Sequence, residues 1–322
     1  MPMISVVVPV YNEVGTIERL CAELFRVLDS IPCRYTIVFV DDGGTDGTGE
    51  ALDRLHERFV NRVTVLHLSR NFGHQAALTA GFDHAEGDAV ICLDADMQHP
   101  PETIRELFAC WQAGFEVVQA VRRPTPNIGY FKNLTAHLFY GMMNRLSTIH
   151  MEQGGCDFRL LSRRVADILR TDLRERERFV RGLTSWVGFR SCKVEFDAAD
   201  RFAGESKYSI GKMVAFARTG LISFSKLPLR LAVIVGLGVS GISLLYGLYV
   251  VFAFLMYAAV VPGWASTVLV VTFLGGCQML FLGLLGEYVA TIFEEVKGRP
   301  LYLLADVRKA AAVEQQQKSA SA

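Results

Sequence analysis

Two aspartates one residue apart follow an apolar run in the stretch AVICLDADMQHPPE, residues 89–102. Residues i and i+2 of a strand share a face, so Asp94 and Asp96 could point at one spot. Two carboxylates in one place need a cation or a shared proton to coexist. Aspartate is also common in turns, and Pro100 with Pro101 ends a strand. The pair alone therefore fits a metal site or an ordinary turn.

The first half of the chain alternates between strand and helix patterns. Apolar runs predict strands at 4–10, 35–40, 63–68, 89–93 and 117–121, and helical spacing predicts helices at 16–28, 51–59, 75–85 and 101–112. Alternating strands and helices predict an α/β fold with a mainly parallel sheet and helices on both faces. Ligands of such sheets bind beyond the carboxyl ends of the strands.

Four polar clusters follow strands and are expected on that one edge. They are residues 11–13, Asp41 with Asp42, Asp94 with Asp96, and Arg122 with Arg123. In the first cluster, Tyr11 could stack on a base and Glu13 could accept hydrogen bonds from sugar or base groups. An ordinary turn, with Asn12 as a helix cap, explains that cluster equally well.

The glycine-rich turn VDDGGTDGTGE follows the second strand. It lacks the GK[ST] ending of a phosphate-binding P-loop. Asp41 and Asp42 would repel phosphate, but they suit ribose hydroxyls or the N–H edge of a uracil.

A long apolar segment lies in the second half. No residue from Leu231 to Gly286 is charged or histidine, which is enough for two membrane-spanning helices with a break near Pro262. Basic residues flank the segment on both sides, whereas the connecting loop has no charge, so both ends are expected on the cytoplasmic side. Before it, residues 210–224 have the spacing of an interfacial helix.

The composition excludes several other classes. The net charge is +0, which gives no global field that would attract nucleic acid. The 7 scattered cysteines form no CxxC pair and suit a reducing cytosol. The first residues have no basic region before their short apolar run and are expected to form a strand, not a signal peptide.

These patterns predict four regions. They are a cytosolic catalytic domain at 1–208, juxtamembrane amphipathic helices at 209–228, two transmembrane helices at about 231–257 and 264–288 within 229–290, and a cytosolic C-terminal tail at 291–322. A further helix is expected at 130–146.

Four motifs in order, PVYNE, DDGGTDGT, RNFGHQAALTAG and DADMQHPPE, resemble the family 2 nucleotide-sugar glycosyltransferases with the GT-A fold. More narrowly, the chain is similar to polyisoprenyl-phosphate glycosyltransferases, a group that includes bactoprenol glucosyltransferases and dolichol-phosphate mannose synthase. This similarity continues through GGCDFRLLSRR, RFVRGL, RFAGESKYS and GEYVATIFEEVKGRPLY. One departure is Gly44, where the family usually has serine, so a hydroxyl contact is lost at that point.

The resemblance implies a nucleotide-sugar site that is formed by Pro9, Tyr11, Glu13, Asp41, Asp42, Asp94, Ala95, Asp96 and Gln98. Asp94 would lie near the ribose or sugar. Asp96, with Gln98, would bind Mg²⁺ or Mn²⁺ that bridges the diphosphate and stabilises charge on the departing UDP. Hard divalent cations take oxygen ligands and often keep only one or two protein ligands beside phosphates.

An anionic lipid acceptor would need cations of its own. The candidates are Arg122, Arg123, Lys132, Arg201 and Lys207. For any one of them the alternative is a solvated or headgroup-facing charge. Arg201 and Lys207 are favoured, because RFAGESKYS matches the family and precedes the expected interfacial helix.

Asp157 has three open interpretations. With Asp94 and Asp96 it belongs to the candidate catalytic residues, and it could act as a general base. A phosphate monoester is already ionised near pH 7, so positioning the sugar hydroxyls or the acceptor is an alternative. A structural aspartate paired with Arg159 is the third.

The expected activity is inverting transfer of a sugar, by resemblance glucose, from a UDP-sugar to polyisoprenyl (undecaprenyl) phosphate. The expected setting is the cytoplasmic face of the inner membrane, with membrane lipid as a partner, no nucleic acid, and a homo-oligomer that is a tetramer by resemblance. A different lipid or polysaccharide acceptor is the alternative, although the QxxRW motif of processive synthases is missing. A non-catalytic sugar-nucleotide sensor is disfavoured, because the acidic residues are intact.

Overall fold

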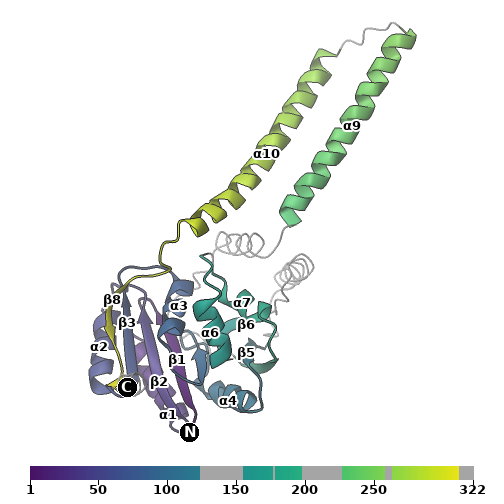
Figure 1. The fold of residues 1–322 in the computed structure, drawn as a ribbon. Helices are drawn as coiled ribbons and strands as arrows, with labels where there is room; N and C mark the ends of the chain where they lie inside the picture. The colour runs from purple at the N-terminus through teal and green to yellow at the C-terminus, as the bar shows by residue number, and fades with distance from the viewer. Residues whose placement is uncertain (124–154, 177, 198–226, 258–262, 312–322) are drawn as a thin grey trace. The chain divides into compact units, whose positions relative to one another are not determined.

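The protein is described by a computed structural model that covers residues 1–123, 155–176, 178–197, 227–257 and 263–311 (Figure 1). The chain divides into two compact units, and we describe each by itself. The first unit comprises residues 1–209 and 299–322, and the second comprises residues 210–298. The helix expected at 130–146 and most of the juxtamembrane segment 209–228 lie outside the described residues.

The described part of the first unit has an eight-stranded sheet in the order β7-β5-β6-β4-β1-β2-β3-β8. The strands are β1 (Met3–Val10), β2 (Arg34–Asp41), β3 (Val63–Leu68), β4 (Ala89–Cys92), β5 (Val117–Arg122), β6 (Gly155–Ser162), β7 (Ser191–Phe196) and β8 (Leu304–Arg308). Strands β4, β1, β2 and β3 run parallel, as do β5 and β7. Strand β6 is antiparallel to both β4 and β5, and β8 is antiparallel to β3. The prediction of a mainly parallel α/β sheet is confirmed, with β6 and β8 as the antiparallel strands.

Helices cover both faces of the sheet. They are α1 (Ile17–Leu28), α2 (Thr48–Arg58), α3 (His74–His84), α4 (Ile104–Gln112) after the short turn η1 (Pro101–Thr103), α6 (Arg163–Thr171) and α7 (Val180–Trp186). Every residue of β1 is buried, and its side chains alternate between the two faces. Ile4, Val6 and Val8 belong to the core that also contains the buried side chains of α1, α2 and α4. Val7 points to the opposite face, where α3 packs.

The second unit contains two long helices, α9 (Leu227–Tyr257) and α10 (Trp264–Val296). Each includes a window that is long and apolar enough to cross a membrane, at Ala232–Tyr249 and Phe273–Val296. Most described side chains in these windows are exposed. The predicted spans at 231–257 and 264–288 fall within the two helices.

Part of the predicted C-terminal tail at 291–322 forms regular structure. Helix α10 continues to Val296, and Leu304–Arg308 returns to the sheet as β8. An edge strand such as β3 presents unpaired backbone groups, and β8 pairs with them. Beyond β8, Ala311 N donates a hydrogen bond to Val60 O. The five-residue strand Leu-Ala-Asp-Val-Arg carries two charges, so its sequence has no clear strand pattern.

The close packing of α3 on β1 gives a stability prediction. A Cβ atom at Gly81 would overlap the buried Val7 side chain. We expect overpacking in Gly81→Ala to destabilise the full-length protein by roughly 1–3 kcal/mol. The better helix propensity of alanine would offset up to about 1 kcal/mol of this loss. The measurement is the thermal unfolding midpoint in detergent.

Gly15→Ala is the matched control, because a Cβ at Gly15 would meet no atom within 4 Å. Its unfolding midpoint should stay close to that of the wild type. If Gly81→Ala unfolds at the same temperature as Gly15→Ala, the close packing of α3 on β1 is contradicted.

Candidate active site

The strand directions bring the acidic clusters to one edge of the sheet. Strands β1, β2 and β4 run parallel, so the residues that follow them lie at the same edge. Strand β6 runs the opposite way and begins at that edge, where it supplies Asp157. Asp157 therefore lies at the same edge as Asp41, Asp42, Asp94 and Asp96. We call this edge of the sheet the acidic edge.

The loops after β1 and β2 are connected by hydrogen bonds. Asn12 has a positive φ of 55°, and its side-chain oxygen accepts a hydrogen bond of 2.8 Å from Thr45 N. Glu13 N donates to Thr48 Oγ1 at 2.9 Å. Asn12 therefore holds a neighbouring loop and does not cap α1, whose N-cap is Thr16. The fastened loop presents Tyr11 with 42% of its surface exposed.

Asp42 has a structural role that the sequence did not predict. Its carboxylate is only 3% exposed and accepts hydrogen bonds from Phe72 N at 2.7 Å and Gly73 N at 3.0 Å. Burial raises the pKa of Asp42, and these two N–H groups oppose that shift. The carboxylate thus holds the loop before α3. A direct contact between Asp42 and a nucleotide remains a prediction.

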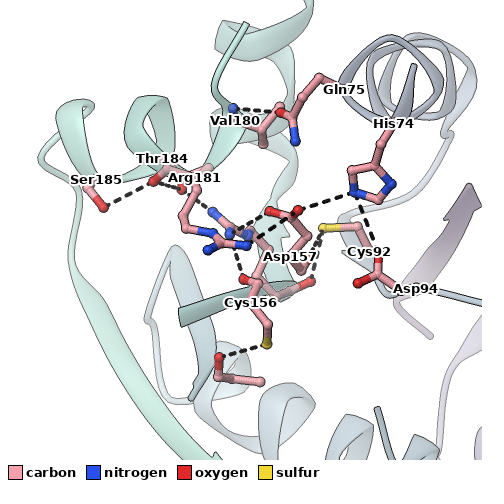
Figure 2. Close-up of polar contacts among 12 residues, drawn as sticks. His74, Gln75, Cys92, Asp94, Cys156, Asp157, Val180, Arg181, Thr184 and Ser185 are labelled. Carbon is pink, nitrogen blue, oxygen red and sulfur yellow. Dashed lines mark hydrogen bonds and ion pairs between the residues drawn. The ribbon is translucent and has the colours of Figure 1, made fainter. Parts of the chain in front are cut away.

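His74, Asp94 and Asp157 meet at the start of α3 (Figure 2). His74 Nε2 lies 3.2 Å from Asp157 Oδ2 and 3.5 Å from Asp94 Oδ1. Burial lowers the pKa of His74, but the hydrogen bond that His74 donates to Asp157 and the charges of both carboxylates outweigh it, so the pKa is raised. The imidazole therefore tends to be a cation between two anions.

Asp157 is held by further cations. Its Oδ1 lies 3.2 Å from Arg159 Nη2, and its Oδ2 lies 3.6 Å from Arg181 Nη2. Burial raises the pKa of Asp157, but His74, Arg181 and Arg159 outweigh it and hold the pKa well below its usual range. A general base works best when its pKa lies near the working pH. This geometry favours a positioning role over proton abstraction.

Asp94 differs from Asp42 and Asp157, because its side chain is 32% exposed. Its Oδ1 is buried and accepts no hydrogen bond from any residue that the structure describes. Burial raises the pKa of Asp94, against the opposing charges of His99 and His74. The backbone N–H of Asp94 donates to His99 Nδ1 at 3.1 Å, and His99 stacks on Phe158. His74 Nε2 lies 3.5 Å from Asp94 Oδ1, but the hydrogen-bonding capacity of this oxygen is not used by any described residue, so it suits a substrate hydroxyl.

The shared-face argument for Asp94 and Asp96 is wrong. Strand β4 ends at Cys92, so both residues lie in the following loop, where strand alternation does not apply. Met97 has a left-handed φ of 61°, and Gln98 N donates to Asp96 Oδ1 at 3.0 Å. The loop conformation, not the strand, orients Asp96.

The residues that the structure describes do not form a metal centre by themselves. Within the described ranges no group of three or more histidine, cysteine, aspartate or glutamate side chains could hold a metal ion. Asp96 and Gln98 still offer oxygen ligands of the kind that hard divalent cations prefer. These residues fit a cation that takes its remaining ligands from phosphate and water.

Of the predicted acceptor cations, Arg122 and Arg123 lie in the described part of the chain. Arg122 ends β5, and Arg123 pairs with Glu195 at 3.3 Å and Asp197 at 3.0 Å. Arg123 would have to exchange these exposed pairs to bind a phosphate. Lys132, Arg201 and Lys207 lie outside the described residues.

Sequence reasoning assigned no role to His74, His99 and Arg181, and it considered Arg159 only as a pairing partner. His74 stands in the RNFGHQ motif, which was a signal, and Arg181 stands in RFVRGL. Arg159 is 1% exposed, which its charged residue type did not suggest. Nothing in the sequence pattern marks His99.

Comparison with known proteins decides the family. The model of glycosyl transferase family 2 matches residues 5–169, which include the whole acidic edge from Pro9 to Asp157. The chain belongs to glycosyl transferase family 2. It is therefore an enzyme that transfers sugars. Arg181 and β8 lie beyond the matched segment of this family 2 glycosyltransferase.

Relatives match this family 2 glycosyltransferase over almost its full length. The uncharacterized glycosyltransferase sll0501 of Synechocystis sp. is 41% identical over 94% of this chain and 95% of its own. The bactoprenol glucosyl transferase of Shigella phage SfII is 41% identical over 94% of this chain and 97% of its own. Among solved structures, the mannosyltransferase PcManGT from Pyrobaculum calidifontis, in complex with GDP-Man and Mn²⁺, matches with a TM-score of 0.46 and 21% identity over 64% of this chain and 58% of that one.

The ionisation of His74 gives a pH prediction. A histidine whose folded pKa is raised contributes stability that is complete below its unfolded pKa and is lost as the pH rises through the folded value. We therefore expect His74→Gln to lower the unfolding midpoint more at about pH 6 than at about pH 9, on either side of the ordinary histidine pKa. Thermal unfolding in detergent at the two pH values measures the difference.

Glu18→Gln, which removes an exposed carboxylate of α1, serves as the control. It should leave the unfolding midpoint close to wild type at both pH values. If the gap between His74→Gln and wild type is equal at both pH values, or larger at the alkaline one, the charged pairing of His74 is contradicted.

Proposed function

We propose that this protein transfers a sugar from a UDP-sugar to polyisoprenyl phosphate, with inversion at the anomeric carbon. The observation that carries the proposal is the 41% identity with bactoprenol glucosyl transferase over 94% of the chain. An alignment of that extent includes both the acidic edge and helices α9 and α10. Glucose is the proposed sugar and undecaprenyl phosphate the proposed acceptor.

The donor nucleotide would lie over the edge formed by β1, β2 and β4. Tyr11 has an exposed ring on which a base can stack, next to Pro9 and Glu13. Asp41 would accept hydrogen bonds from the base or ribose. Asp94 Oδ1, which lacks a hydrogen-bond partner among the described residues, would accept one from a ribose or sugar hydroxyl.

Asp96 with Gln98 would hold Mg²⁺ or Mn²⁺ beside the diphosphate, next to Ala95. Asp96 is a half-buried carboxylate in a loop whose conformation is set by its own hydrogen bond. When bound, the metal would stabilise negative charge on the departing UDP. The protein's contribution is to orient that carboxylate toward the phosphates.

Asp157 would position substrate hydroxyls or the acceptor instead of removing a proton. Its cationic surroundings hold it ionised, and an acceptor phosphate is already ionised near pH 7. In the transfer, a phosphate oxygen bonds to the anomeric carbon from the face opposite to UDP. The bond between that carbon and the UDP oxygen breaks, and UDP leaves with the electron pair.

Helices α9 and α10 support a membrane setting for this reaction. Both expose large apolar side chains, and each has a window that could span a membrane. We propose that the catalytic unit and both termini are cytoplasmic at the inner membrane. The acceptor phosphate would then be recruited by basic residues such as Arg122, Arg123, Lys132, Arg201 and Lys207. A tetramer remains a prediction from family resemblance.

The transfer can be tested directly. Purified full-length protein with radiolabelled UDP-glucose, undecaprenyl phosphate and Mg²⁺ or Mn²⁺ should give a labelled product that partitions into chloroform. Omission of the lipid phosphate is the control and should abolish the product. If no common nucleotide sugar gives a chloroform-soluble product, the proposed function is wrong.

The role of Asp96 can be tested in the same assay. We expect Asp96→Asn to lower the transfer rate by about a hundredfold or more, because a metal ion contributes several kcal/mol of charge stabilisation. Glu18→Gln replaces an exposed carboxylate on α1 and should retain the wild-type rate. A fully active Asp96→Asn protein would remove Asp96 from the metal site.

A further inference from the structure

A row of four ionisable side chains connects the acidic edge to the C-terminal strand. Asp41 Oδ2 lies 3.0 Å from His67 Nδ1, and His67 Nε2 lies 3.1 Å from Asp53 Oδ1. Asp53 Oδ2 lies 2.9 Å from Arg308 Nη2. The four residues come from β2, β3, α2 and β8, so four separate elements must be in place to complete the row.

The sheet register builds this row. Asp41 is opposite His67 in the β2–β3 pair, and in the β3–β8 pair Arg308 is opposite Val65. Helix α2 approaches closely at Gly49, where a Cβ atom would lie 3.1 Å from Asp41 Oδ2. The absence of a side chain at position 49 leaves room for the hydrogen bond between Asp41 and His67.

Both oxygens of Asp41 are fixed. Gly44 N donates to its Oδ1 at 2.9 Å, and His67 contacts its Oδ2. A carboxylate oxygen has two acceptor positions, so each oxygen keeps capacity for a further donor. The two hydrogen bonds therefore set the plane of the carboxylate without exhausting its ability to accept.

His67 is suited to this task because it stands between two carboxylates. The hydrogen bond with Asp41 raises its pKa, burial opposes the shift, and Asp53 adds to the increase. Arg308 also pairs with Asp306 at 3.2 Å and reaches Glu57 at 3.9 Å. The row runs from a buried carboxylate at Asp41 to a partly exposed guanidinium at Arg308.

We propose that β8 positions the donor-binding carboxylate through this row. Arg308 holds Asp53, Asp53 holds His67, and His67 fixes Asp41 so that its remaining acceptor positions face the base or ribose of the donor. The inference rests on the proposed function, which places the donor nucleotide at Asp41. His67, Asp53 and Arg308 are positioning residues. Donor affinity thus depends on a segment that follows the two apolar helices in the sequence.

A purely structural row would behave differently. If the row only attached β8 to the sheet, its loss would lower stability, but a folded variant would bind donor normally. If it positions Asp41, a folded variant binds UDP more weakly, and the contributions of His67 and Arg308 are not independent. Residues that act through one shared contact show such coupling in a double-mutant cycle.

The experiment measures the Kd of UDP for full-length protein in detergent with Mn²⁺ by isothermal titration calorimetry. We expect His67→Leu to raise the Kd about tenfold, as for the loss of a hydrogen bond to a charged group. Arg308→Gln should raise it about threefold, since the ion pair it breaks is partly exposed. The double variant should bind no more weakly than His67→Leu alone. In the transfer assay, the KM for UDP-glucose should rise while kcat stays within about twofold of wild type.

Two further variants act as controls. Arg308→Lys keeps the charge next to Asp53 and should restore most of the affinity that Arg308→Gln loses. Arg62→Gln breaks an exposed ion pair with Asp29 in the same unit and should leave the Kd unchanged. If His67→Leu does not fold, as judged by thermal unfolding, Arg308→Gln decides the question.

The outcomes separate this inference from the proposed function. Unchanged UDP affinity in folded His67→Leu, or in folded Arg308→Gln, overturns the positioning role. The positioning role is also overturned if Arg308→Gln raises the Kd of UDP by the same factor in the wild-type protein and in the His67→Leu variant. A wild-type protein that binds UDP but labels no lipid overturns the proposed acceptor and leaves the positioning role intact. A wild-type protein that binds no UDP overturns both.

Discussion

Burying a carboxylate costs free energy unless hydrogen bonds or cations compensate for the lost water, and this constraint orders the whole acidic edge. Asp42 is compensated by two backbone N–H groups, Asp157 by His74, Arg159 and Arg181, and Asp41 by Gly44 N and His67. The three buried carboxylates are thus stabilised by three different sets of partners. Each set also fixes the direction in which its carboxylate points.

Asp94 differs from these three acids. One of its oxygens is buried without a hydrogen-bond partner among the described residues, and burial raises its pKa against the opposing charges of His99 and His74. The other acids have been stabilised by the protein, whereas Asp94 is stabilised only in part. A bound donor that offers a hydroxyl to Asp94 Oδ1 would supply the missing compensation. The proposed contact between a substrate hydroxyl and Asp94 would thus follow from the same constraint that holds Asp41, Asp42 and Asp157 in place.

The sequence predicted the parts of this arrangement that depend on local patterns. Strands β1 to β5 and helices α1 to α4 show clear periodicity, and strand ends in a parallel sheet must share an edge. The pairing partners could not be predicted in this way. In the sequence, nothing distinguishes His67 from other residues of a strand. Arg159 has the residue type of a surface cation, but it lies in β6, which pairs with β4 on one side and β5 on the other. Burial of such groups depends on which strands become neighbours, which local spacing does not record.

Local patterns do not describe two segments. Asp94 and Asp96 were given strand geometry, but β4 ends at Cys92 and the loop takes over, with Met97 in a left-handed conformation. The segment at 304–308 was included in the C-terminal tail predicted at 291–322, and this short charged edge strand has no alternating apolar pattern. In neither case does strand periodicity describe the conformation: local hydrogen bonds set the loop after β4, and pairing with β3 sets β8. Strand β8 exists because β3 offers an unpaired edge.

The return of the chain to β3 changes how the second unit should be regarded. Residues 210–298 stand between two segments of a single unit, since the sheet contains strands from both sides of them in the sequence. In the sequence, the two apolar helices are thus an insertion between residues of the first unit. They are not a terminal segment that a truncation could remove without also removing residues of the first unit. Losing everything after α9 would also remove β8, expose the edge of β3 and leave Asp53 without Arg308. Because His67 links Asp53 to Asp41, the two apolar helices are connected to the carboxylate of Asp41 through the covalent chain and β8.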